Sequence, residues 1–179
     1  MEVVVPDEFK YLYVQNDERP VVKVPNAVLR AKAADVLKVG RKEQLLIDEM
    51  MRVMKRSNGV GLAAPQLGIG RRIIVFAPDG SRPAALINPR VIRAEGELKR
   101  EEGCLSIPGL YGDVSRPAYV EVEGLDRRGR QVSLELEDMP ARVVQHEIDH
   151  LDGVLFIDKV DVSTLHWSHP DRVEHDENE

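Results

Sequence analysis

The chain has a single cysteine, Cys104, among its 179 residues, so no disulfide can form within it. Aromatic residues make up only 4% of the sequence, and there is one tryptophan. No apolar run reaches the roughly 18 residues of a membrane helix, and charged residues interrupt the start, MEVVVPDEFK, where a signal peptide would be apolar. These features predict a soluble cytoplasmic protein that has neither a membrane span nor a disulfide framework.

Basic residues are outnumbered by acidic residues. Lys and Arg total 25 against 31 Asp and Glu, which gives a net charge of −6. A protein that binds nucleic acid through its phosphates needs a broad positive surface, so we expect no direct nucleic-acid partner. The length and the 42% hydrophobic content suffice for one buried core, which indicates a single catalytic or binding domain.

Apolar spacing predicts two helices, over 42–57 and 139–151, the first ending at Asn58-Gly59 and the second at Gly153. Asp138 is the expected acidic cap of the second helix. Short apolar or alternating runs predict strands at 71–77, 83–88, 119–125 and 130–138, the last two joined as a hairpin. The predicted fold is a single α+β domain with short, mostly antiparallel sheets around a central helix that carries HExxH.

The segment QHEIDHLDG contains the strongest chemical signal in the chain. On a helix, positions i and i+4 share one face, so His146 and His150 can bind the same metal ion. Glu147 lies beside that ion without being a ligand, which is the position of a general base. An open catalytic site normally needs a third protein ligand.

Several residues compete for that third place. A metzincin protease would have histidine where Phe156 stands, and a thermolysin-like metallopeptidase would depend on Glu174, which lies in a polar tail. The remaining candidate is Cys104 in EEGCLSIPG, whose thiolate suits a soft or borderline ion. A metallopeptidase and a non-catalytic module stabilised by a structural metal stay as alternatives.

Three motifs resemble those of the peptide deformylases: GVGLAAPQ (59–66), EGCLS (102–106) and HEIDH (146–150). They stand in that family's order, and the similarity covers residues 21–160. The resemblance implies a catalytic domain over 21–160, preceded by an N-terminal extension (1–20) and followed by a polar tail (161–179). The extension is expected to form an added strand, a dimer contact or a disordered arm.

The resemblance also implies an activity, hydrolysis of the N-formyl group from the first methionine of new peptides with release of formate. It makes Cys104, His146 and His150 the metal ligands and Glu147 the general acid/base. Metal-bound hydroxide would attack the formyl carbon. Gln66 and the backbone amide of Leu105 would stabilise the oxyanion.

The same resemblance places the peptide backbone along Val60 and Gly103 like an added strand. Gly61 belongs to this substrate-binding group, and Val60 with Val143 is expected to line the pocket for the methionine side chain. Glu102 and Arg116 match a pair that braces the active-site loop, and Asp149 is expected to be structural. A solvated face is expected for a further set of charged residues, namely Lys99, Arg100, Glu101, Arg142 and Lys159.

The resemblance implies one divalent ion, Fe(II) in the cell, with zinc, nickel or cobalt possible after purification. The expected partners are N-formylmethionyl nascent peptides, with no membrane contact. The tail after Asp161 carries His166, His169 and His175, which we expect to be solvated rather than a second metal site. Because this tail has no helical apolar stripe, docking on the ribosome through a C-terminal helix is not expected.

Overall fold

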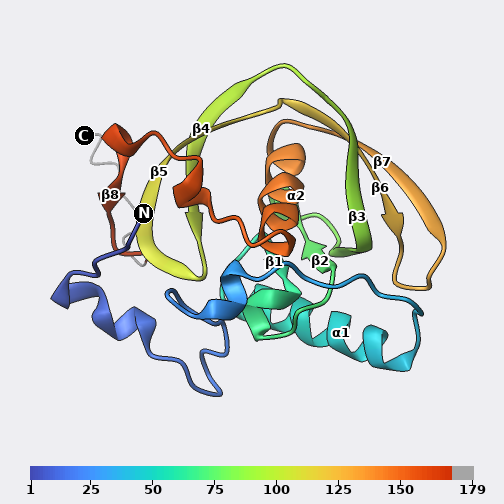
Figure 1. The fold of residues 1–179 in the computed structure, drawn as a ribbon, viewed down its shortest axis with the longest axis horizontal. Helices are drawn as coiled ribbons and strands as arrows, with labels where there is room; N and C mark the ends of the chain where they lie inside the picture. The colour runs from blue at the N-terminus through green and yellow to red at the C-terminus, as the bar shows by residue number, and fades with distance from the viewer. Residues whose placement is uncertain (171–179) are drawn as a thin grey trace, which may run out of the picture.

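The helix that carries HEIDH, α2 (Asp138–Leu151), lies between two antiparallel sheets, and long strands that pass from one sheet toward the other arch over it (Figure 1). The computed structural model describes residues 1–170, with only the backbone described at Asp79. The expected α+β class and the central position of the helix are confirmed. His175 and Glu174 lie outside the described residues.

The larger sheet has the order β1-β2-β3-β6-β7 and the smaller has the order β4-β5-β8, and every pairing is antiparallel. The larger sheet consists of β1 (Gly61–Ala63), β2 (Ile73–Phe76), β3 (Ala84–Glu95), β6 (Tyr119–Leu125) and β7 (Gln131–Glu137). The smaller sheet consists of β4 (Leu98–Cys104), β5 (Ile107–Arg116) and β8 (His166–Trp167). Both β1 and β4 are therefore edge strands.

The predicted hairpin of β6 and β7 is confirmed, and its turn shows why the chain reverses there. The Asp126 carboxylate accepts from the backbone N–H groups of Arg128 (2.8 Å) and Arg130 (3.0 Å). Gly129 has φ +79°, a conformation that glycine adopts without steric cost. The strands β4 and β5, by contrast, were not predicted, and β3 runs well beyond its predicted end at residue 88.

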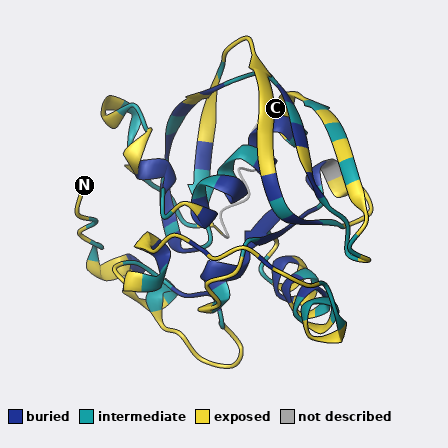
Figure 2. Ribbon diagram, turned by 45° about the vertical axis from the view of Figure 1, so that its right-hand side comes forward, coloured by how far each residue is buried: buried dark blue, intermediate teal, exposed yellow. Residues whose placement is uncertain are grey.

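The first helix, α1 (Arg41–Arg56), begins one residue before its predicted start and ends one residue before its predicted end. The Glu43 side chain accepts from the Gly40 N–H at 2.8 Å, which caps the first turn. The apolar side packs against the larger sheet, whereas the opposite side is exposed (Figure 2). The residues of α1 that are buried in this contact are Ile47, Met50, Val53 and Met54.

The expected acidic cap of α2 is wrong. Glu137 occupies the cap position without a side-chain hydrogen bond, and Asp138 is the first helical residue, with φ +51°. The Asp138 N–H instead donates to the Ala118 carbonyl at 2.9 Å. Gly153 does follow the end of the helix, as predicted, with φ +72°, and an added Cβ there would lie 2.4 Å from the Arg30 carbonyl oxygen.

The first twenty residues fold onto the smaller sheet. Asp7–Tyr13 forms a 3-10 helix, and Phe9 is 2% exposed, with its ring centroid 5.0 Å from that of Trp167 in β8. His169, one of the tail histidines, stacks on the same ring at 4.4 Å. The expectation of an added strand or a disordered arm is therefore wrong for this segment.

Candidate metal centre and active site

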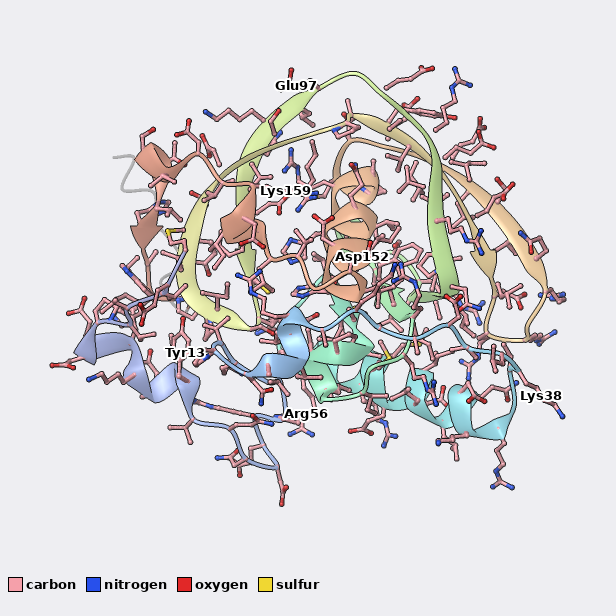
Figure 3. All side chains as sticks on the ribbon, viewed as in Figure 1. Tyr13, Lys38, Arg56, Glu97, Asp152 and Lys159 are labelled. Atoms are coloured by element: carbon pink, nitrogen blue, oxygen red, sulfur yellow. The ribbon has the colours of Figure 1, made fainter. Side chains whose placement is uncertain are left out.

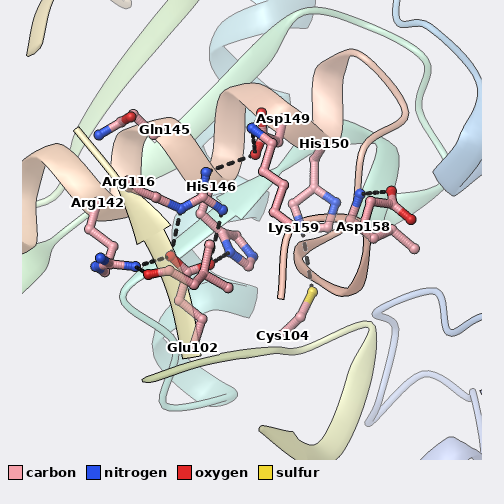
Figure 4. Close-up of polar contacts among 12 residues, drawn as sticks. Glu102, Cys104, Arg116, Arg142, Gln145, His146, Asp149, His150, Asp158 and Lys159 are labelled. Carbon is pink, nitrogen blue, oxygen red and sulfur yellow. Dashed lines mark hydrogen bonds and ion pairs between the residues drawn. The ribbon is translucent and has the colours of Figure 1, made fainter. Parts of the chain in front are cut away.

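Three side chains from β4 and α2 meet at one point. The ligand atoms of Cys104, His146 and His150 all lie within 4.8 Å of one another, and Cys104 Sγ is 3.3 Å from His150 Nε2 (Figure 4). Cys104 is the last residue of β4, where the pairing with β5 shifts register. The sequence predicted this convergence, because HExxH supplies two ligands and the third had to come from another element.

The hydrogen bonds around the histidines suit metal binding. His146 Nδ1 lies 2.9 Å from Glu102 Oε2, and since a carboxylate only accepts, Nδ1 carries the proton and Nε2 is left for an ion. His150 Nδ1 is buried and has no partner within residues 1–170, whereas its Nε2 faces Cys104. Two imidazole nitrogens and one thiolate form a donor set that fits a borderline divalent cation with one position open.

Glu102 is the centre of a buried ionic cluster beside the metal ligands. Arg116 Nε donates to its Oε1 at 2.5 Å and Arg116 Nη2 to its Oε2 at 2.9 Å, so the expected pair is present. Burial alone would raise the pKa of Glu102, but the hydrogen bonds from His146 and Arg116 hold that pKa well below its usual range. Asp149 accepts from Arg116 Nη1 at 2.8 Å, which agrees with its expected structural role.

Arg142 belongs to this cluster, and its assignment to a solvated face is wrong. It is 4% exposed, and its Nη1 donates to Glu102 Oε1 at 2.5 Å and to the Val114 carbonyl at 3.0 Å. The sequence pattern predicts a surface position for an arginine in the second turn of an amphipathic helix. The acceptors that make its burial favourable are distant in sequence, so this pattern does not show them. Lys159 is exposed as expected, and so are the other members of that set, Lys99, Arg100 and Glu101.

Glu147 follows His146, the first candidate ligand of α2, and is buried, at 5% exposure. Its Oε2 has no hydrogen-bond partner within the described residues, and burial raises the pKa of this carboxyl to about 7. A Cβ added at Gly61 in β1 would lie 2.4 Å from Glu147 Oε1, so the carboxylate packs directly on the glycine backbone. Gly61 is thus required for the close approach of β1 and α2.

Gln66 is held with its amide group next to the thiol. Its Oε1 accepts from the Ala63 N–H at 2.9 Å, which leaves Nε2 to point toward Ser106 Oγ (3.2 Å) and Cys104 Sγ (3.7 Å). The Ser106 N–H also donates to Cys104 Sγ at 3.4 Å. Ser106 is fully buried and was not singled out in the sequence, although it stands inside the EGCLS motif.

A cavity of about 660 Å³ opens in front of this cluster. Its walls include all of the expected substrate-binding residues, Val60, Gly61, Gly103 and Val143, together with Gln66, Cys104, Leu105, His146 and Glu147. At Gly103 an added Cβ would lie 2.5 Å from the Tyr111 ring, which explains the glycine next to the ligand cysteine. The structure therefore brings the three motifs together around one cavity, in which edge strands β1 and β4 supply two of the walls.

Comparison with known proteins agrees with this geometry. Residues 18–165 match the family model described as polypeptide deformylase. The chain is 51% identical to the peptide deformylase of Symbiobacterium thermophilum over 78% of its own length and 65% of that protein's, and 50% identical to that of Halothermothrix orenii over 77% and 90%. The chain belongs to the polypeptide deformylase family.

Solved deformylases share the fold as well. A peptide deformylase from Synechococcus elongatus in complex with actinonin superposes with a TM-score of 0.77 at 41% identity, covering 79% of each chain. One from Thermotoga maritima gives 0.75 at 39% identity, over 78% of this chain and 95% of that one. This deformylase is accordingly a metal-dependent hydrolase that removes the N-formyl group from nascent peptides, and neither alternative class is supported. Within residues 1–170, none of the helices has the length and apolarity needed to span a bilayer.

Proposed function

We propose that this deformylase binds one divalent ion through Cys104, His146 and His150 and uses Glu147 to transfer protons. The observation that carries the proposal is the meeting of three candidate ligand atoms within 4.8 Å beside the buried Glu147 carboxyl, whose Oε2 has no hydrogen-bond partner among residues 1–170. When bound, the ion supplies Lewis-acid chemistry, which acidifies water and polarises the formyl oxygen. This chemistry requires a base that is close to the ion and is not itself a ligand.

Glu147 fits that requirement in position and in acidity. Its pKa of about 7 allows it to accept a proton from the attacking water and then to donate that proton to the departing amine nitrogen at neutral pH. The carboxylate rests on Gly61, so its rotation is restricted by the backbone of β1. Transfer of one proton by one side chain completes the cleavage into formate and a free amine.

Charge on the former formyl oxygen is stabilised by two N–H donors, Gln66 Nε2 and the backbone amide of Leu105. Gln66 is preoriented, because its Oε1 is already occupied by the Ala63 N–H. A preorganised donor of this kind contributes about 3–4 kcal/mol to transition-state stabilisation. Leu105 follows Cys104 directly and lines the same cavity.

The formylated peptide binds as an extended strand between the edges of the two sheets. Edge strands present unpaired backbone groups, and β1 and β4 both reach the cavity with Gly61 and Gly103 among its walls. Val60 and Val143 receive the methionine side chain, since a flexible thioether adapts to small apolar walls. The catalytic unit comprises residues 21–160, with 1–20 as an extension and 161–179 as a polar tail.

Fe(II) is the proposed physiological ion, and zinc, nickel or cobalt can replace it on purification, because the thiolate-imidazole set accepts each of them. The substrates are N-formylmethionyl nascent peptides, which implies a cytoplasmic enzyme that works close to ribosomes. Docking on the ribosome through a C-terminal helix is not part of the proposal. Direct binding to nucleic acid or membrane is not part of the proposal.

The test separates the ligands from the proton carrier. Protein purified without oxygen is analysed for bound metal, and formate release from formyl-Met-Ala-Ser is followed. Glu147→Gln is expected to retain one ion per chain while kcat falls by about 10²–10⁴, whereas Cys104→Ala is expected to lose metal. Glu123→Gln, at an exposed residue of β6 outside the cavity, serves as the control. Unchanged metal content in Cys104→Ala, or full activity in Glu147→Gln, would refute the assignment.

A further inference from the structure

Residues 1–20, the N-terminal segment, form one wall of the catalytic cavity. Leu12, Glu18 and Arg19 are among its lining residues, as are Val143, His146 and Glu147 of α2. The segment is anchored to β5 by Phe9, whose ring packs on Gly109. A Cβ added at Gly109 would lie only 2.7 Å from that ring. The family match begins at residue 18, so Leu12 lies outside the region shared with the family model, whereas Glu18 and Arg19 lie at its start.

A second anchor joins the segment to the end of α1. Arg56 Nη2 donates to the Glu18 carbonyl at 3.3 Å, and Arg56, labelled in Figure 3, also lines the cavity. Arg19 Nη1 donates to the Tyr11 carbonyl at 2.8 Å, which fixes the guanidinium on the segment. The wall is therefore held at both ends, at β5 and at α1.

Three basic side chains line the cavity on or next to the N-terminal segment. Arg19, Lys23 and Arg56 all line the cavity, and none of them forms an ion pair within residues 1–170. Lys23 Nζ donates to the Val21 carbonyl at 2.6 Å and is half-buried. Burial lowers the pKa of Lys23 to about 8, so the side chain is still mainly protonated at neutral pH.

Carboxylates in the cavity do not cancel these cations. Glu102 is already neutralised by Arg116 and Arg142. Glu101 lies 3.3 Å from His166 Nε2 in β8, and Glu18 is exposed to solvent. Glu147 is buried against Gly61, away from the solvent-exposed part of the N-terminal segment. A negative group that enters along the N-terminal segment therefore meets three cations that lack a carboxylate partner.

We propose that Arg19, Lys23 and Arg56 form a subsite that selects formylated peptides with a carboxylate in the two residues after formylmethionine. The inference rests on the proposed function, since the methionine pocket and the reaction centre fix where the following residues lie. The carboxylate belongs either to an aspartate side chain or to the free end of a short peptide, and both present the same chemistry. The three residues act on substrate binding and take no part in the chemical step.

The experiment compares isosteric peptides on the metal-loaded, full-length enzyme. Formyl-Met-Asp-Ala amide is expected to have a kcat/KM about fivefold above that of formyl-Met-Asn-Ala amide, mainly through KM, and added salt should reduce the ratio. Formyl-Met-Ala-Ala with a free carboxylate, compared with its amide, separates the chain end from the side chain as the source. In Arg19→Gln/Lys23→Gln the Asp-to-Asn ratio should fall toward one.

The matched control is Lys32→Gln/Lys38→Gln, which removes the same charge from exposed residues outside the cavity and should preserve the ratio. Equal kcat/KM for the charged and uncharged peptides in the wild-type enzyme would overturn the subsite, even if the double variant did not fold. The same loss of ratio in the control would show a nonspecific effect of net charge and would also overturn it. Absence of formate release from every peptide would instead contradict the proposed function.

Discussion

Replacing Glu102 by glutamine removes the carboxylate that faces Arg116, Arg142 and His146 in the interior. Removing one partner of a buried ion pair costs about 3–5 kcal/mol, because a charge stays buried without compensation. Arg116 retains Asp149 at 2.8 Å, so the deficit falls mainly on Arg142, which keeps only backbone acceptors. We therefore expect Glu102→Gln to lower the free energy of unfolding by the smaller end of this range, about 3 kcal/mol.

Urea unfolding of the metal-free protein measures this loss directly. With a slope of about 2–3 kcal/mol per molar, the midpoint should fall by roughly 1–1.5 M. Metal affinity should also fall by about 10–100-fold, because Glu102 holds the Nδ1 proton of His146 and so fixes the orientation of the ring. The two measurements are independent, since the first is made without metal.

Glu101→Gln is the matched control, because this neighbour on β4 is exposed and its ion pair is with His166, which is not part of the cluster. Its free energy of unfolding should stay within about 0.5 kcal/mol of the wild-type value. A loss below about 1 kcal/mol in Glu102→Gln, or an equal loss in both variants, would refute the view that Glu102 compensates the buried arginines.

Two further predictions concern close packing around the cavity. Gly61→Ala places a Cβ 2.4 Å from Glu147 Oε1 and should displace the carboxylate. We expect kcat to fall by at least about tenfold while the metal content stays unchanged. The control is Gly70→Ala, whose Cβ meets no atom within 4 Å and which should keep wild-type activity. Phe9→Ala removes a ring that is 2% exposed and should destabilise the docking of residues 1–20 by about 3 kcal/mol, seen as faster amide hydrogen exchange in that segment. The exposed Val14→Ala should leave this exchange unchanged, and equal exchange in the two variants would contradict the anchoring role of Phe9.

The ionic cluster illustrates why part of the site was not predictable. Arg142 makes contacts with Glu102, Val114 and Leu98, which come from strands far away in the sequence. In the sequence, Arg142 cannot be distinguished from the charged residues that lie on the exposed side of the same helix. Burial of an arginine depends on acceptors that tertiary packing supplies, so the expectation of a solvated residue was reasonable and wrong.

The N-terminal segment gives a second case. Its 3-10 helix has one buried apolar anchor, Phe9, and the glycine beneath that ring stands a hundred residues later in β5. The strand β4 was missed because four of its seven residues are charged, and β5 was missed because a proline and two glycines interrupt its apolar pattern. The spacing of apolar residues predicts burial within one helix or strand, but it does not predict which distant segment covers a given residue.

The sequence by itself determined the class of chemistry of this deformylase, a metal-dependent hydrolysis, and predicted which residues carry it. Helical spacing put His146 and His150 on one face with Glu147 between them, and the thiol of Cys104 was the remaining donor suited to the same ion. Tertiary structure alone decided the surroundings: which carboxylate orients His146, which glycine lets Glu147 reach the cavity, and which segment closes the far wall. Ligand spacing is a local property of one helix, whereas burial, charge compensation and the walls of a cavity exist only after distant strands have packed together.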